Sequence, residues 1–273
     1  MTSNWQGQTA VVATMHHKEK VIAPLLAEIG IQCCTIANFD TDRFGTFTRD
    51  IPRPHNQLET AKLKARSVLD LCDHPLAIAS EGSFFPHPAI PLLACNREVV
   101  VLYDRRQDIY IWAEEVSTNT NFNHCQAKTW REVEEFAEKV GFPEHGLVVI
   151  ADRITKGITD WEVLKRVVTE VWQQQTKVHI ETDMRAMFNP TRMQNIAQAT
   201  EKLVRKLQSH CPACNCPGFD VVEHRPGLPC AWCGTPTQQT AAIVYGCLSC
   251  SYTKEERVTP AQADPQFCPF CNP

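Results

Sequence analysis

The last quarter of the chain contains four Cys-x-x-Cys pairs, a spacing that places two thiolates on one metal ion. The gaps between successive pairs are 15, 13 and 17 residues, within the range of zinc ribbons. Because Zn²⁺ takes four thiolates in a tetrahedron, eight thiolates predict two four-cysteine sites and two structural zinc ions. The predicted ligands are Cys211, Cys214, Cys230, Cys233, Cys247, Cys250, Cys268 and Cys271.

The sequence leaves open which pairs share an ion. Sequential pairing joins the first pair with the second and the third with the fourth, because these stretches form two similar knuckle–strand–knuckle units. Nested pairing joins the second with the third, because residues 230–250 alone resemble a complete ribbon around a hairpin. Cys216, His210 and His224 lie nearby as alternative ligands, although we expect them to be spectators.

Disulfides are the competing interpretation of these cysteines. No signal peptide opens the sequence, and the other cysteines stand singly or as the vicinal Cys33-Cys34. Both features predict a reducing, cytoplasmic location, in which thiols stay available for a metal ion.

A second group of polar residues could bind phosphate and a divalent cation. A predicted buried strand ends at Thr14, and His16 and Lys20 follow where a helix begins, which favours an anion. Glu59 lies in the first turn of a predicted helix and Glu81 at the end of a predicted strand. Two carboxylates that converge at such ends suit Mg²⁺. The helix dipole by itself also explains an acid at the position of Glu59.

The elements that would position these residues alternate along the chain. Hydrophobic patterns predict strands at 9–14, 32–37, 76–84, 98–104, 109–118 and 146–151. Helices are predicted at 20–29, 57–72, 129–140 and 190–208, with a further one capped by Asp160. The alternation predicts an α/β domain with a mixed sheet over residues 1–208, followed by a zinc-ribbon module over residues 209–273.

Several blocks of the first domain resemble the inosine/xanthosine triphosphate pyrophosphatase-like (ITPase-like) superfamily of nucleotide hydrolases. The stretch VVATMHHKEK is similar to the family's A-T-x-N-x-x-K loop, and LETAKLKAR to its E-N-A-x-x-K-A-R helix. The stretch AIASEGSF places Glu81 where the family has an acid before glycine, and NPTRM supplies Arg192 in place of the S-H-R arginine. His16, Ser80 and Thr191 stand where the family has Asn, Asp and His.

This resemblance implies Mg²⁺-dependent cleavage of a nucleoside triphosphate with release of pyrophosphate. Glu59 and Glu81 would hold the metal ion, and the substrate would meet Thr14, His16, Lys20, Lys64, Ser80 and Arg192. A non-catalytic nucleotide-binding or protein-docking module is the alternative, and the relative positions of Glu59 and Glu81 distinguish the two hypotheses.

The blocks TDRFGTFT, VSTNTNF and FPEHGLVV, together with the cysteine tail, resemble an uncharacterised bacterial family that carries only a domain-of-unknown-function label. This second resemblance covers almost the whole chain and implies no activity.

Charge and hydropathy restrict the partners. The chain has 273 residues, a formal net charge of −4 and no apolar run long enough to span a membrane. From Lys206 onward, four Lys/Arg face five Asp/Glu, and each zinc site with four thiolates adds further negative charge. Nucleic-acid binding needs the opposite sign, so we expect the module to serve as a structural cap, a homodimer contact or a protein-docking surface. A contiguous basic face of Arg43, Arg49, Arg53, Lys62, Lys64 and Arg66 would reverse that expectation.

Overall fold

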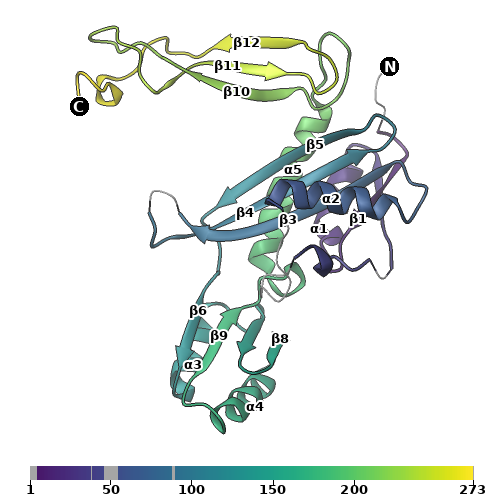
Figure 1. Ribbon diagram of the computed structural model, residues 1–273, viewed down its shortest axis with the longest axis vertical. Coiled ribbons are helices and arrows are strands. Elements are labelled where there is room, and N and C mark those ends of the chain that lie inside the picture. The colour runs from purple at the N-terminus through teal and green to yellow at the C-terminus, as the bar shows by residue number, and fades with distance from the viewer. Residues whose placement is uncertain (1–4, 38, 46–54, 88–89, 273) are drawn as a thin grey trace. The chain divides into compact units, whose positions relative to one another are not determined.

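The computed structural model describes residues 5–37, 39–45, 55–87 and 90–272 (Figure 1). The described chain divides into two compact units, residues 5–204 and residues 205–272. No helix in these ranges is both long enough and apolar enough to cross a membrane.

A five-stranded mixed sheet forms the centre of the first unit. Its strand order is β2-β1-β3-β4-β5. β1 (Gln8–Ala13) runs parallel to β2 (Ile31–Thr35) and β3 (Leu76–Pro86), whereas β4 (Ala94–Asp104) and β5 (Ile109–Ser117) are antiparallel additions. The mixed sheet that the sequence predicts is therefore present, with β3 carrying both kinds of pairing.

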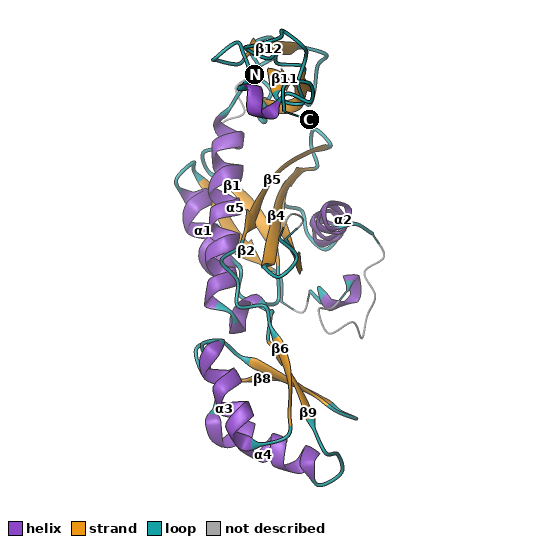
Figure 2. Cartoon of the chain, turned by 90° about the vertical axis from the view of Figure 1, so that its left-hand side faces the viewer, coloured by secondary structure: helices purple, strands orange, loops and turns teal. Residues whose placement is uncertain are grey.

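Helices cover both faces of this sheet. Figure 2 shows α1 (Glu19–Ala27) and α5 (Pro190–Gln208) on one face and α2 (Gln57–Leu69) on the other. Side chains alternate between the faces of a strand, so Ala77 and Ala79 of β3 share a buried cluster with Ala65 and Val68 of α2. The next residue of β3 on this face is Glu81, a carboxylate that continues an otherwise apolar row.

A second sheet, which the sequence analysis did not predict, follows β5. Its order is β6-β9-β7-β8, made of β6 (His124–Ala127), β7 (Leu147–Ile150), β8 (Ile154–Ile158) and β9 (Val178–Thr182). One face packs against α3 (Trp130–Lys139) and α4 (Trp161–Trp172) around a core that includes Phe136, Leu164 and Ile180. β6, β8 and β9 have five residues at most and mix polar with apolar side chains, so their hydrophobic signal is weak.

The predicted helix starts are present. Asn189 accepts a hydrogen bond from the Arg192 backbone N–H at 2.9 Å and thereby caps α5. Thr129 and Glu132 form the predicted capping box of α3, and Asp160 caps α4. The cap at Asn189 matters most for the site below, because it fixes the turn that carries Arg192.

The second unit is an antiparallel meander with a short 3-10 helix. β10 (Asp220–Pro226), β11 (Thr240–Gly246) and β12 (Thr253–Arg257) pair in sequential order, and η3 (Pro265–Phe267) precedes the last cysteine pair. Cysteine pairs stand before or after every strand, so the ends of this small sheet are the places where metal can bind.

Candidate functional site

Two groups of four cysteines lie in the second unit, and each could hold one zinc ion. The first is Cys211, Cys214, Cys247 and Cys250, and the second is Cys230, Cys233, Cys268 and Cys271. Sulfur–sulfur distances are 3.5 and 3.7 Å in the first group and 3.6 and 3.8 Å in the second. A tetrahedral ion with Zn–S bonds of ~2.3 Å places its sulfurs ~3.8 Å apart, so the spacing suits zinc.

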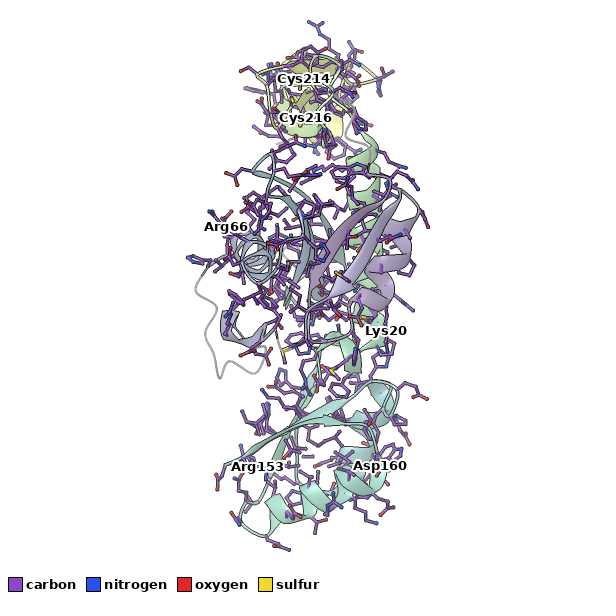
Figure 3. All side chains as sticks on the ribbon, turned by 90° about the vertical axis from the view of Figure 1, so that its right-hand side faces the viewer. Lys20, Arg66, Arg153, Asp160, Cys214 and Cys216 are labelled. Atoms are coloured by element: carbon purple, nitrogen blue, oxygen red, sulfur yellow. The ribbon has the colours of Figure 1, made fainter. Side chains whose placement is uncertain are left out.

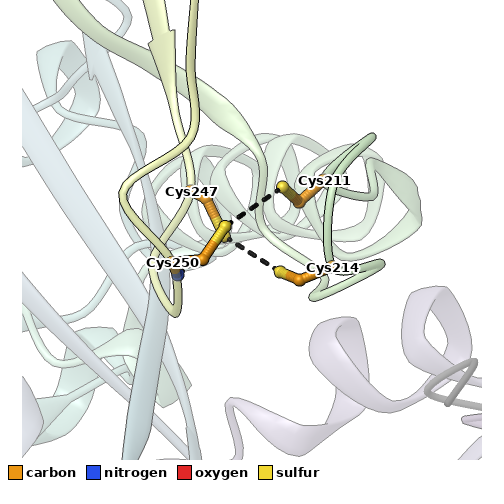
Figure 4. A group of neighbouring side chains, drawn as sticks. All are labelled: Cys211, Cys214, Cys247 and Cys250. Carbon is orange, nitrogen blue, oxygen red and sulfur yellow. Dashed lines mark hydrogen bonds between the residues drawn. The ribbon is translucent and has the colours of Figure 1, made fainter.

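Both pairings considered for the cysteines are wrong, because the knuckles cross over. The first Cys-x-x-Cys pair joins the third, as Figure 4 shows, and the second joins the fourth. The meander explains this. The start of β10, the end of β11 and the start of β12 lie at one end of the sheet, and the first and third knuckles are attached there. The other two knuckles are attached at the opposite end.

The knuckles have donors directed at sulfur, as a metal-binding turn requires. The backbone N–H groups of Ser249 and Cys250 donate to Cys247 Sγ at 3.3 Å, and that of Trp232 donates to Cys230 Sγ at 3.4 Å. Burial acts in the opposite direction, yet these N–H groups lower the pKa of the Cys247 thiol to about 6. The thiolate form is thus favoured at Cys247, one of the four cysteines of the first group.

The alternative ligands lie outside both cysteine groups. Cys216 is buried, and its thiol donates to the Pro217 carbonyl, while burial and the neighbouring Cys247 raise its pKa to about 11. Figure 3 labels Cys216 next to Cys214. The His210 ring lies 2.9 Å from the Gln208 carbonyl, and His224 is exposed on β10.

A cavity of about 230 Å³ lies in the first unit, where β1 ends and the chain turns toward α1. We call it the β1 pocket. Strand order reverses between β1 and β3, because β2 lies on one side of β1 and β3 on the other. Open α/β sheets bind ligands at such a switch point. Its described lining contains five cations and four carboxylates: Lys18, Lys64, Lys156, Arg185, Arg192, Asp42, Glu81, Glu181 and Asp183.

Glu81 and Lys64 form a buried ion pair at the wall of this pocket. Their side chains are 6% and 8% exposed, and Lys64 Nζ contacts Glu81 Oε1. Gln57, at the start of α2, donates to the Glu81 carbonyl at 2.6 Å and to the Arg97 carbonyl at 2.7 Å. The first turn of α2 is therefore fastened to β3 and β4, and this sets where Lys64 enters the pocket.

Lys18 reaches the same place from the opposite face of the sheet. Its Nζ donates to the carbonyl and to Oγ of Ser80, at 2.9 and 3.0 Å. Burial and the cationic Arg192 lower its pKa to about 7, against the opposing effect of Glu81 and Glu98. Successive residues of β3, Ser80 and Glu81, thus each hold one lysine at the pocket.

Arg192 is a fully buried cation held by a polar network. Its Nε donates to Glu98 Oε1 at 2.8 Å, and its Nη1 donates to the Met184 carbonyl. Gly82 makes room for this pair, because a Cβ there would lie 2.5 Å from both Arg192 Nη2 and Glu98 Oε1. Asn96 donates to the same carboxylate at 2.9 Å. The guanidinium is therefore held in one orientation.

The second sheet contributes the remaining charges. Arg185 pairs with Asp183 at 2.6 Å, and the backbone N–H of Gly157 donates to the same carboxylate at 2.9 Å. Glu181, on β9, lies 2.8 Å from His179 Nε2. Glu181, Asp183 and Arg185 thus add further charged groups to the lining of the pocket.

His16 and Asp42 form a contact at the pocket wall. His16 Nε2 lies 3.4 Å from Asp42 Oδ1, and the His16 backbone N–H donates to Thr14 Oγ1 at 3.1 Å. Burial lowers the pKa of His16 to about 3, with smaller contributions from nearby cations, of which Lys18 and Arg192 are the largest. Burial and Asp40 raise the pKa of Asp42. Asp42 belongs to the 3-10 helix η1 (Asp42–Phe44).

The structure brings most, but not all, of the predicted site residues together. Thr14, His16, Lys64, Glu81 and Arg192 line the β1 pocket, and Ser80 lies behind it as the acceptor for Lys18.

The structure places two of the predicted site residues, Glu59 and Lys20, outside the lining of the β1 pocket. The Glu59 side chain is half exposed and pairs with Lys62 at 2.8 Å, so it points away from Glu81. Lys20 is exposed on α1 (Figure 3), and the buried Lys18 takes the place expected for it. Glu59 is adjacent in sequence to the α2 residues that face the sheet, but it is not one of them. Lys20 lies within α1, and its side chain faces solvent.

The basic face considered for nucleic acid is also incomplete. Lys64 is buried against Glu81, so it does not join Lys62 and Arg66 at the surface. Arg49 and Arg53 lie outside the described residues.

Sequence reasoning missed Lys18, Asp42, Glu98, Asp183 and Arg185. Lys18 lies between His16 and Lys20, the two residues that the sequence predicts for the site, and only its burial distinguishes it from Lys20. The acid-rich run at 40–42 gave a signal that a loop of unusual composition lies next to the strand end.

Comparison with known proteins gives one match. Residues 64–273 match the model of a family described as "Domain of unknown function (DUF6671)". Neither the curated proteins nor the solved structures contain a match to the chain. The matched range includes Lys64, Glu81, Arg192 and all eight cysteines of the two groups, whereas Thr14, His16 and Lys18 precede it.

Proposed function

Since the chain belongs to the DUF6671 family of unknown function, we propose from the β1 pocket that it is a metal-dependent phosphohydrolase. The substrate is a nucleoside triphosphate or a similar phosphorylated small molecule, and the product is pyrophosphate. One observation carries the proposal: Lys18, Lys64 and Arg192 are all buried, and all three line one cavity at the end of the central strand. Lys64 pairs with Glu81 and Arg192 with Glu98, whereas Lys18 is held by the neutral Ser80, so an anionic ligand would offset the buried charge that these two carboxylates leave uncompensated.

Each of these cations comes from a different element, so together they can contact a polyanion from several sides. Lys18 precedes α1, Lys64 lies on α2, and Arg192 lies in the first turn of α5. Their protein partners fix the side chains from behind, as Glu98 does for Arg192 at 2.8 Å. Prepositioned cations stabilise the charge that develops when a phosphoryl group is transferred.

We assign magnesium binding to Glu81. This carboxylate lines the pocket, and Mg²⁺ is usually held by one or two carboxylates together with substrate phosphates. Within the described residues, the groups of three or more side chains close enough to hold a metal ion by themselves are the two cysteine groups. This favours an ion that arrives with the phosphates, where it would polarise the phosphoryl oxygens.

The resemblance to ITPase-like hydrolases supports the same assignment in modified form. Thr14, Lys64, Glu81 and Arg192 keep the roles that the resemblance implies, and Lys18 replaces Lys20. Glu59 leaves the metal site, so Glu81 is the single carboxylate that the resemblance and the pocket share.

The zinc module is proposed as a structural unit with a docking role for a protein partner or a second copy. Trp232 and Phe270, the third residues of the knuckles in the second cysteine group, are 78% and 74% exposed. Exposed aromatic side chains are enriched at protein interfaces. Eight thiol ligands also favour a reducing compartment such as the cytoplasm.

The test is a panel of nucleoside triphosphates with Mg²⁺, in which released pyrophosphate is measured. Wild type should turn over at least one of them, and Glu81→Gln should lose ~100-fold or more in kcat. Glu59→Gln is the matched control, since it makes the same chemical change on the exposed side of α2 and should keep wild-type activity. Absence of turnover together with absence of any nucleotide-induced thermal shift would refute the proposal.

Binding without turnover is the second candidate. The separation of Glu59 from the pocket favours it, because a pair of carboxylates that share one metal ion was expected and only one of them is there. A thermal shift with nucleotide but no release of pyrophosphate would select this function.

A further inference from the structure

The ring of His16 lies at the wall of the β1 pocket, beside the carboxylate of Asp42. The residue is 9% exposed, its backbone N–H donates to Thr14 Oγ1, and its ring faces the carboxylate of Asp42. The cations of the pocket can only donate hydrogen bonds. The carboxylates of the pocket only accept them, so the role of His16 depends on which of its ring nitrogens carries a proton.

Asp42 determines which ring nitrogen of His16 carries the proton. An ionised carboxylate only accepts, so the nitrogen that faces it, Nε2 at 3.4 Å, must be the one that bears hydrogen. In a neutral ring the other nitrogen, Nδ1, then has a free lone pair. Nδ1 is buried and has no hydrogen-bond partner among the described residues.

The ring stays neutral because of its surroundings. Burial lowers the pKa of His16 to about 3, and Lys18, Arg192, Arg185 and Lys64 act in the same direction. Asp42 is the acid that contacts the ring, and it does not offset these effects. His16 is thus an acceptor throughout the physiological pH range.

Phosphate oxygens cannot satisfy this acceptor, since at neutral pH they too accept hydrogen bonds. A donor must therefore come from a second molecule or from another part of the ligand. In a hydrolase that molecule is water, whose hydrogen can point to Nδ1 while its oxygen lone pair faces phosphorus.

We propose that His16 orients the attacking water through Nδ1, with Asp42 as the residue that fixes its tautomer; this rests on the proposed function. The water oxygen forms a bond to the α-phosphorus, and the bond from that phosphorus to the bridging oxygen breaks. The bridging oxygen leaves with the electron pair as part of pyrophosphate. The proton of the water passes to solvent, because His16 is too weak a base to keep it.

The experiment compares two substitutions of His16 in the full chain, on a triphosphate that the wild type hydrolyses. His16→Leu removes the acceptor and should lower kcat ~100-fold with KM within ~3-fold of wild type. His16→Asn keeps a carbonyl oxygen near the position of Nδ1 and should recover activity to within ~10-fold of wild type. Asp42→Asn should lower kcat ~10-fold, because its amide no longer enforces the tautomer.

The controls separate structural damage from the proposed role. His17→Leu changes the adjacent histidine, which is exposed beside Glu19, and should leave kcat unchanged. Inorganic triphosphate should raise the melting temperature of His16→Leu as much as that of wild type, since the cations remain.

Three results would overturn the inference. An unchanged kcat in His16→Leu refutes it while leaving the phosphohydrolase intact. Equal losses in His16→Leu and His16→Asn, with triphosphate no longer bound, assign His16 a purely structural role. A wild type that releases no pyrophosphate from any nucleotide overturns the proposed function, and the role of His16 with it.

Discussion

The crossed pairing of the cysteine knuckles makes a quantitative prediction about zinc content. Replacing the first and third knuckles together, as Cys211→Ser, Cys214→Ser, Cys247→Ser and Cys250→Ser, removes one complete site and leaves the other complete. The bound zinc should fall from two ions per chain to one. Replacing the first and second knuckles instead removes half of each site, and the zinc content should fall to zero.

The magnitude follows from the geometry of the sites. A complete four-cysteine site with sulfurs 3.6 and 3.8 Å apart retains a full set of ligands, and structural zinc binds such a set with about 10–16 kcal/mol. A site left with two thiolates loses most of that affinity. Zinc per chain is measured by elemental mass spectrometry after gel filtration, and cobalt substitution reports tetrahedral thiolate coordination.

The two quadruple variants are matched, since each removes four thiols. Removal of the second and fourth knuckles serves as the reciprocal control and should also leave one ion. Retention of one ion after loss of the first and second knuckles, with none after loss of the first and third, would refute the crossed pairing and restore the sequential one.

Three further predictions concern the two units. Lys64→Met leaves Glu81 as a buried charge without its lysine, so the free energy of unfolding in urea should fall by about 3–5 kcal/mol. The double variant Lys64→Met with Glu81→Gln should recover most of that loss. Equal stability of the single and double variants would contradict the ion pair. Burial lowers the pKa of Lys18 from 10.5 to about 7 in the folded chain, so between these pH values the unfolded state holds more protons. The free energy of unfolding of the wild type, relative to Lys18→Met, should therefore rise by about 1.4 kcal/mol for each pH unit in this range. A flat difference in urea denaturation between pH 7 and pH 10 would exclude that burial penalty. A strong zinc chelator should unfold residues 205–272 but not residues 5–204, as hydrogen exchange would show; simultaneous loss of protection in both units would contradict their independence.

The parts of the fold that the sequence anticipated are those with strong local signals. The helix starts at Asn189, Thr129 and Asp160 are determined by short-range hydrogen bonds, and the apolar runs of β1, β3 and β4 are long enough to identify. The second sheet was not predicted from the sequence, because β6, β8 and β9 are short and half polar. Its stability comes from packing on α3 and α4, which no short stretch of sequence encodes.

The candidate site divides in the same way. Glu81 and Lys64 could be picked from local patterns, because a carboxylate on an apolar strand is conspicuous. The choice between Lys18 and Lys20, and between Glu59 and the acids of other elements, depends on which face of the helix or loop is buried. Burial of one particular lysine is a property of the packed chain.

The zinc module shows most clearly which features the sequence predicts and which depend on the tertiary structure. The sequence by itself predicted the eight cysteines as metal ligands, since a Cys-x-x-Cys turn presents two sulfurs whatever surrounds it. The tertiary structure decided which turns share an ion, because antiparallel pairing of β10, β11 and β12 sorts the turns to opposite ends of the sheet. Ligand identity is local chemistry, whereas ligand partnership depends on how strands far apart in sequence come to lie side by side.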